Sequence, residues 1–196
     1  MSIIDRIINP FKAAPKISLV KPHGKISREV KENDLKRLKE VAQQMVILAG
    51  AMVMRKVVVE VYAISHPQVD AKDPMRFFVF CPQSKSIRDR VNEFDRSFVI
   101  VNPRIVRSTQ VMVEKQEGCV TFLGMANVPV MRHNKIEVEY QQIERNKFSG
   151  ELSLTGYKHK DFSGIMAQIF QHEIDHFNAI YVHKNWKELN RTYYKI

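Results

Sequence analysis

The stretch QHEIDH (residues 171–176) places two histidines four positions apart, with a glutamate directly after the first. Apolar residues at helical spacing surround it, so we expect a helix that begins near Asp161 or Ser163. On one face of this helix His172 and His176 can bind one metal ion, and Glu173 can accept a proton from a water molecule at that ion. Two histidines on a solvated helix face would give the same pattern, so the stretch alone leaves both interpretations open.

A hydrolytic metal site needs a third protein ligand and one open coordination position. Downstream candidates are His183 and Glu188, and upstream Cys119 stands in EGCVT (residues 117–121). A thiolate is a strong, soft ligand for iron or zinc. The alternative is a buried apolar cysteine, which fits Cys81, at the end of RFFVFC (residues 76–81), better than it fits Cys119.

The composition is that of one globular domain. The chain has 196 residues, 44% of them hydrophobic and 27% charged, with a formal net charge of +10. Only 7 residues are glycine and none stands in a phosphate-loop motif, which argues against a nucleotide site. Two cysteines cannot form a disulfide framework, which suits a reducing compartment, and no apolar run is long enough to cross a membrane.

The apolar pattern predicts a helix, then strands, then a second helical region. Before residue 34 the chain is basic and contains prolines, so we expect an extended lead-in with one short helix at its start. Helices are predicted over 34–54, to residue 177 through the histidine stretch, and over 184–193. Strands are predicted over 56–64, 76–81, 97–101 (ended by Asn102-Pro103), 104–114, 135–140 and 151–155, with an exposed charged loop over 82–96. Because strands and helices do not alternate, the fold class is α+β with antiparallel-looking strands.

Two motifs resemble those of the peptide deformylase family. EGCVT (117–121) resembles the family's EGCLS, and QHEIDH (171–176) matches its QHExDH. Val101-Asn102-Pro103 and GIMA (164–167) resemble flanking family segments, so the resemblance covers about residues 34–182. It implies antiparallel or mixed sheets around a central helix that carries the histidines. We therefore expect one catalytic domain over 1–182, followed by a basic tail or helix over 183–196.

The resemblance also implies a reaction and its residues. The metal ligands would be Cys119, His172 and His176, with Glu173 as the base. The side-chain amide of Gln68 and the backbone N–H of Val120 would stabilise the oxyanion. The metal would be Fe²⁺, with Zn²⁺ or Ni²⁺ possible on the same ligands. The expected reaction is hydrolysis of the formyl group from N-formylmethionine on nascent polypeptides, with release of formate.

One motif departs from the family pattern. VYAISHPQ (61–68) aligns with GxGxAAxQ, so Val61 and Ala63 replace both glycines while Gln68 is kept. A Cβ at each position is expected to narrow the approach of the substrate backbone. Ser65 and His66 replace the two alanines, and His66 has either a substrate contact or a structural role. The residues expected to contact substrate are Tyr62, Ala63, Glu117, Gly118 and Ile169, with Tyr62 and Ile169 beside the methionine side chain.

Two other functions remain open, together with the place of action. The same residues would suit a zincin-type metallopeptidase, whose third ligand would not be Cys119, or a deformylase-like binding protein with weak catalysis. Asp175 is expected to pair with Arg132 or to be solvated. The basic, aromatic tail after residue 182 could dock on the ribosome, and no DNA or membrane partner is expected. We expect a cytoplasmic protein, with an organelle as the alternative because the N-terminus is basic and amphipathic.

Overall fold

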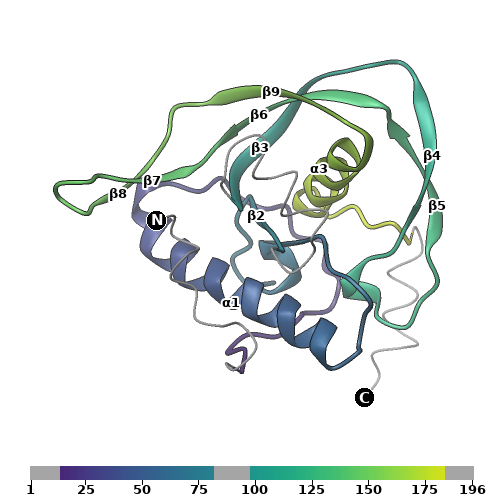
Figure 1. Cartoon of the computed structure of the whole chain (residues 1–196), viewed down its shortest axis with the longest axis horizontal. Helices are drawn as coiled ribbons and strands as arrows, with labels where there is room; N and C mark the ends of the chain where they lie inside the picture. The colour runs from purple at the N-terminus through teal and green to yellow at the C-terminus, as the bar shows by residue number, and fades with distance from the viewer. Residues whose placement is uncertain (1–13, 82–97, 184–196) are drawn as a thin grey trace.

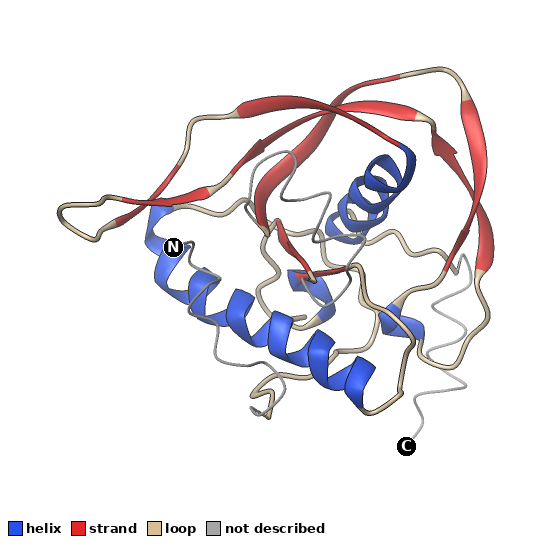
Figure 2. Cartoon of the chain, viewed as in Figure 1, coloured by secondary structure: helices blue, strands red, loops and turns tan. Residues whose placement is uncertain are grey.

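The computed structural model describes residues 14–81 and 98–183, in which curved antiparallel strands arch over one helix (Figure 1). A five-stranded sheet has the order β1-β2-β3-β6-β9, and the pairs β4-β5 and β7-β8 form two small sheets. Figure 2 shows helix α3 under the arch and helix α1 outside it. The strands are β1 (Ala63–Ser65), β2 (Phe77–Phe80), β3 (Val99–Ser108), β4 (Met112–Glu117), β5 (Val128–His133), β6 (Lys135–Gln141), β7 (Ile143–Arg145), β8 (Leu152–Leu154) and β9 (Lys158–Ser163). The helices are α1 (Leu35–Met54) and α3 (Gly164–Phe177), with short turns η2 (Glu32–Asp34), η3 (His66–Gln68) and η4 (Val120–Phe122).

Strand β2 is buried on both faces and separates two hydrophobic cores. Phe78 and Phe80 belong to the core around α3, whereas Phe77 and Val79 belong to the core around α1. Successive side chains of a strand point to opposite faces, so each core receives every second residue. A strand covered on both faces has no solvent side, which explains why this run contains no polar residue. The α+β fold with antiparallel sheets around the histidine-bearing helix is confirmed.

Helix α3 begins directly where strand β9 ends. Its N-cap residue is Ser163, and Gly164 has a φ of +58°, in the left-handed region that glycine adopts at low cost. This residue turns the chain from strand to helix without a loop. Of the two predicted caps Ser163 is therefore right, whereas Asp161 lies inside β9. The helix predicted over 34–54 is confirmed by α1, which covers Leu35–Met54.

Two predicted strands have wrong boundaries. The strand predicted over 56–64 is formed only as β1, because residues 57–62 run beside the cavity with no described strand paired to them. The strand predicted over 97–101 does not end at Asn102-Pro103: β3 continues to Ser108, with a register shift between Val101 and Arg104. Asn102 has a φ of 49°, and this irregularity accommodates the proline within the strand.

The remaining strand predictions are partly right. Strands β2, β6 and β8 lie within or close to predicted segments, but the predicted strand over 104–114 is divided between β3 and β4. Strands β5, β7 and β9 were not predicted. In β9 the side chains alternate between half-buried and exposed up to Phe162, the one fully buried residue, so its sequence carries little apolar signal.

The described part of the N-terminal segment, residues 14–31, is extended, as expected, but it is fixed to the domain. Ser27 N–H donates to the carbonyl of Phe177 at 2.8 Å, and Arg28 forms an isolated bridge with Met75. The helix expected near the start, the loop over 82–96 and the helix over 184–193 lie outside the described residues. Within the described residues, no helix is long and apolar enough to cross a membrane.

Candidate metal centre and active site

Three ligand atoms converge where α3 passes the end of β4. Nε2 of His176 lies 3.2 Å from Nε2 of His172 and 3.3 Å from Sγ of Cys119. All three atoms lie within 4.8 Å of one another. Metal–ligand bonds of about 2.0–2.3 Å at tetrahedral angles separate ligand atoms by about 3.3–3.6 Å. The three side chains therefore fit around one tetrahedral ion, for which they are the three ligands found among the described residues.

Helical spacing and a short turn create this convergence. His172 and His176 lie one turn apart on α3, and their rings meet edge-to-face with centroids 4.8 Å apart. Strand β4 ends at Glu117, Gly118 comes next, and Cys119 is the N-cap residue of η4. Asn127 Oδ1 would lie 2.4 Å from a Cβ at position 118, so the loop packs closely against the backbone there.

Glu117 orients the first histidine. Its Oε2 lies 3.0 Å from Nδ1 of His172, so this nitrogen carries the ring proton and Nε2 is left for a metal. Arg132 donates two hydrogen bonds to the same carboxylate, at 2.8 and 2.7 Å, and a third to Asp175 at 2.6 Å. Burial would raise the pKa of Glu117, but Arg132 and His172 lower it to about 2. The expected pairing of Asp175 with Arg132 is confirmed.

The two histidines favour the thiolate form of Cys119. Burial by itself would raise the pKa of Cys119, but the imidazoles of His176 and His172 outweigh burial and hold it well below its usual range. Burial would lower the pKa of His172, yet hydrogen bonds with Cys119 and Glu117 raise it well above its usual value. The thiolate is the form of cysteine that binds metal. Cys81, by contrast, is fully buried in the α1 core, as expected.

Glu173 is buried beside these three side chains. It is 3% exposed, and its Oε2 has no hydrogen-bond partner among the described residues. Burial raises the pKa of this carboxyl above its usual value, although the two histidines act in the opposite direction. A carboxylate with a raised pKa and a free oxygen is suited to take up a proton and return it.

The amide of Gln68 is held in one orientation. Its Oε1 accepts hydrogen bonds from the backbone and hydroxyl of Ser65, at 2.8 and 3.1 Å. Its Nε2 donates to the hydroxyl of Thr121 at 2.9 Å and lies 3.4 Å from Sγ of Cys119. The donor group of Gln68 therefore points toward the three candidate metal ligands. The holding residues Ser65 and Thr121 were not predicted, although both stand within the quoted motifs.

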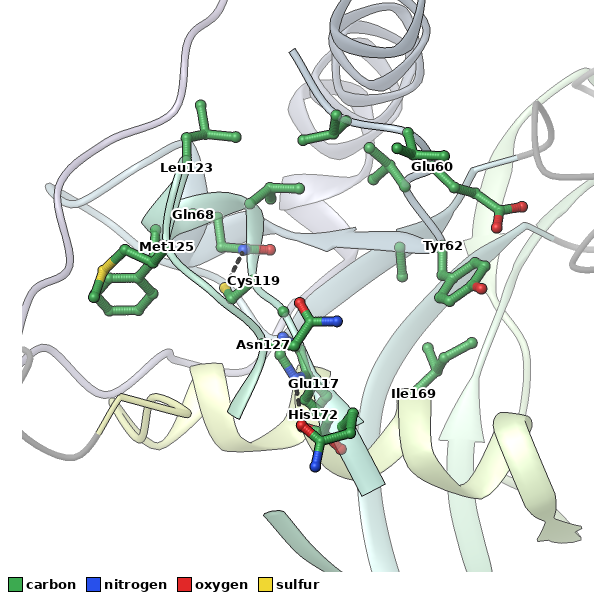
Figure 3. Close-up of a pocket in the computed structure, with 18 of the residues that line it drawn as sticks. Glu60, Tyr62, Gln68, Glu117, Cys119, Leu123, Met125, Asn127, Ile169 and His172 are labelled. Carbon is green, nitrogen blue, oxygen red and sulfur yellow. Dashed lines mark hydrogen bonds and ion pairs between the residues drawn. The ribbon is translucent and has the colours of Figure 1, made fainter. Parts of the chain in front are cut away.

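A cavity of about 590 Å³ opens beside these groups (Figure 3). Its walls come from residues 57–63, from the loop over 116–127, and from α3. Figure 3 shows Tyr62 and Ile169 on one side and Leu123 and Met125 on the other. Every residue predicted to contact substrate lines this cavity, as do most of the predicted metal and catalytic residues: Tyr62, Ala63, Gln68, Glu117, Gly118, Cys119, Val120, Ile169, His172 and Glu173.

The two residues that replace glycines are part of the hydrophobic cores. Val61 is 4% exposed and packs in the α1 core, and Ala63 packs in the α3 core. The effect of their side chains on substrate approach stays a prediction. His66 is fully buried, with Met75 N–H donating to its Nδ1 at 2.9 Å, which assigns it a structural role.

Two further residues near the site were not predicted. The ring of Tyr181 lies against that of His176, with centroids 5.1 Å apart. His23 contacts the Gln68 turn through the carbonyl of Pro67, at 3.0 Å. Neither residue belongs to a motif. His23 lies 44 residues from Pro67 and 158 residues from Tyr181, so sequence spacing gives no signal for these contacts.

Comparisons with known proteins agree with the motifs. The chain is 38% identical over 85 residues to a peptide deformylase of Thermus thermophilus, covering 43% of this chain and 38% of that protein. It is 30% identical over 143 residues to peptide deformylase 2 of Shewanella oneidensis, covering 73% of this chain and 67% of that protein. The matched segment thus spans between about two fifths and two thirds of the length of these relatives.

Solved structures give the same result over a longer range. A peptide deformylase of Plasmodium falciparum matches with a TM-score of 0.60 and 25% identity, covering 89% of this chain and 91% of that one. A peptide deformylase of Synechococcus elongatus in complex with actinonin matches with a TM-score of 0.62 and 23% identity, covering 91% and 86%. The family model for polypeptide deformylase matches residues 21–192. The chain therefore belongs to the polypeptide deformylase family.

Proposed function

We propose that the protein hydrolyses the formyl group from N-formylmethionine at the N-terminus of nascent polypeptides and releases formate. The observation that carries this proposal is the convergence of Cys119, His172 and His176 next to the buried Glu173 and the donor amide of Gln68. A ligand set, a base and an oxyanion donor at one end of a cavity are what amide hydrolysis requires.

Glu173 moves the proton of the reaction. A divalent ion on the three ligands supplies a Lewis acid that activates water near neutral pH and polarises the formyl carbonyl. Glu173 accepts a proton from the attacking water and returns it to the peptide nitrogen as the C–N bond breaks. The products are formate and a free α-amino group. The raised pKa and the unpartnered oxygen of Glu173 support this role.

Gln68 and Val120 stabilise the negative charge that develops on the formyl oxygen. The amide Nε2 of Gln68 is aimed at the cluster, and Val120 lines the same cavity directly after Cys119. Fixed donors are effective because they need no reorganisation during the reaction, and loss of one costs roughly 10²–10³ in turnover.

The substrate enters between the segment 57–63 and the loop 116–127. Tyr62 and Ile169 form an apolar wall that accepts the methionine side chain, and Ala63, Glu117 and Gly118 line the entry to the metal. The native ion is proposed to be Fe²⁺ by resemblance to the family. One thiolate and two imidazoles can also hold Zn²⁺ or Ni²⁺.

The proposed workplace follows from the substrate. Formylated chains leave the ribosome, and the basic tail after residue 182 is proposed to dock there, in the cytoplasm. An organelle is the alternative, and one relative, from Solanum lycopersicum, is named as chloroplastic. Ribosome binding through phosphates should weaken steeply as salt is raised.

The test is formate release from formyl-Met-Ala-Ser by protein loaded with Fe²⁺ or Ni²⁺. We expect turnover by the loaded protein, and loss of at least about 10³-fold in kcat for Glu173→Gln while its metal content is unchanged. Unformylated Met-Ala-Ser serves as the control substrate. Cleavage of its peptide bonds would identify a metallopeptidase, and metal binding without release of any product would identify a binding protein.

A further inference from the structure

The backbone of the η3 turn is held at each of its carbonyl groups. The carbonyl of His66 accepts from the turn itself, from Val69 and Asp70 N–H at 2.9 and 3.0 Å. The other two carbonyls accept from the N-terminal segment: Gln68 O from Val20 N–H at 2.8 Å, and Pro67 O from the ring of His23 at 3.0 Å. The N-terminal segment thus fixes the turn on which Gln68 stands.

The ring of His23 has a defined tautomer. Its Nδ1 accepts from the N–H of Lys25 at 3.2 Å, so the ring proton is on Nε2 and is donated to the carbonyl of Pro67. That carbonyl belongs to the peptide group that also contains the nitrogen of Gln68. A change in the position of the ring is therefore transmitted to the backbone of Gln68 within one peptide unit.

Tyr181 fixes His23 in turn. Its hydroxyl accepts from the N–H of His23 at 3.1 Å and donates to the carbonyl of the same residue at 3.2 Å. Tyr181 is 6% exposed and lies four residues after α3 ends, with its ring against that of His176. A continuous series of contacts therefore leads from a metal ligand through Tyr181, His23 and Pro67 to Gln68.

We propose that His23 and Tyr181 are positioning residues of the site, which hold the amide of Gln68 at a fixed distance from the metal ligands on α3. The inference rests on the proposed function, because it concerns the oxyanion donor of that reaction. Neither side chain lines the cavity, so both are expected to act through Gln68. Both act on a group whose placement matters most in the transition state, when the charge on the formyl oxygen is largest.

This role predicts a specific kinetic result. In His23→Ala the carbonyl of Pro67 loses its donor, and the amide of Gln68 is less well placed for the oxyanion. We expect kcat on formyl-Met-Ala-Ser to fall about tenfold, less than the 10²–10³ for outright loss of a donor. KM should change by less than about twofold, because ground-state binding does not use this interaction. In His23→Gln the side-chain amide can donate to the same carbonyl, so most of the lost activity should return.

A double-mutant cycle shows whether the effect passes through Gln68. In a Gln68→Ala background the donor is absent, so His23→Ala should change kcat by less than about twofold. Tyr181→Phe keeps the ring against His176 and removes the two hydrogen bonds to His23. Tyr181→Phe should lower kcat by about threefold, and elemental analysis should show a full metal content. This variant tests the proposal even where His23→Ala fails to fold.

His159→Ala is the matched control. His159 is 54% exposed on β9 and does not line the cavity, so its kcat should stay within about twofold of the wild type. The proposal is wrong if His23→Ala and Tyr181→Phe keep wild-type kcat, if the His23 effect is the same with and without Gln68, or if His23→Gln restores nothing. Absence of formate release by the wild type is a different result and overturns the proposed function instead.

Discussion

Oε2 of Glu117 lies 3.0 Å from Nδ1 of His172, and the side chain of Arg132 holds the same carboxylate with two hydrogen bonds. The carboxylate fixes the orientation of the imidazole and makes it a stronger ligand. Arg132 also bonds Asp175, which lies between the two histidines on α3. Its guanidinium group therefore connects strand β4 to the helix that carries both histidines.

Glu117→Gln is expected to weaken metal binding about 10- to 100-fold, the usual cost of losing such a supporting group. The amide can still accept a hydrogen bond, but it carries no charge to balance Arg132 and the histidine. Competition with a chelator measures the dissociation constant. Glu114→Gln, an exposed site on the same strand, is the control and should leave the constant unchanged. Equal constants for the two variants would contradict the role assigned to Glu117.

The two cysteines provide a matched pair. Cys119→Ala removes a proposed ligand, so the purified variant should not hold a stoichiometric ion, as measured by elemental analysis. Cys81→Ala removes a fully buried thiol from the α1 core, so it should keep its ion and lose some stability, as denaturant unfolding measures. A full metal complement in Cys119→Ala would show that this residue is not a ligand.

The residues expected at the site could be recognised because each stands in a short motif, although Cys119 meets His176 across 57 residues and Gln68 meets Cys119 across 51. Helical spacing alone brings His172 and His176 to one face, and Cys119 follows the strand that ends at Glu117. His23 and Tyr181 are 158 residues apart, and their contact depends on the path of the whole chain. No local pattern reports such a contact.

The fold was predictable where burial is one-sided or complete. The apolar runs of α1 and β2 gave their positions because each is covered by a hydrophobic core. In β9 the single fully buried residue is Phe162, so the strand is defined by its backbone pairing with β6 rather than by apolar side chains. The segment 57–62 shows the reverse. It is rich in β-branched residues, yet no described strand pairs with it, and its last carbonyl, that of Tyr62, accepts from Cys81 N–H just after β2.

Asn102 is expected to contribute strongly to stability. Its amide bonds both the N–H and the carbonyl of Val30, at 2.8 and 3.0 Å, and also the side chain of Gln141 at 2.8 Å. Asn102→Ala removes these bonds and places alanine at a φ of 49°, so urea unfolding should show a loss of about 3 kcal/mol. Asn102→Gly removes the same bonds but tolerates this φ, so it should be the more stable variant. A loss below about 1 kcal/mol in Asn102→Ala would show that the bonds to Val30 are dispensable.

Burial of His66 should make stability depend on pH. Burial lowers the pKa of this imidazole to about 4, with smaller effects from Asp70, Arg37, Asp73 and Arg28. Between pH 6.5 and 4 the unfolded chain binds the proton and the folded chain does not, so stability is full above pH 6.5 and is lost as the pH falls. The difference amounts to about 3 kcal/mol.

His66→Asn isolates this effect, because its side-chain oxygen can still accept from Met75 N–H but does not titrate in this range. Unfolding free energies of both proteins, measured from pH 7 to 4, should converge or cross as the wild type loses the contribution of the neutral imidazole. Parallel curves would mean that His66 is protonated in both states or in neither.

Gly118 should be required only because of the side chain that covers it. A Cβ there would lie 2.4 Å from Oδ1 of Asn127, whereas at Gly156 no atom lies within 4 Å. Gly156→Ala should therefore stabilise the protein by about 0.5 kcal/mol, through the unfolded chain. Gly118→Ala should destabilise it by about 1–2 kcal/mol, the range for mild overpacking.

In an Asn127→Ala background the same substitution should become neutral or stabilising, because the overlapping atom is gone. Urea unfolding of the four proteins of this cycle gives the coupling directly, and a penalty for Gly118→Ala that persists without Asn127 would place its cause in the backbone instead.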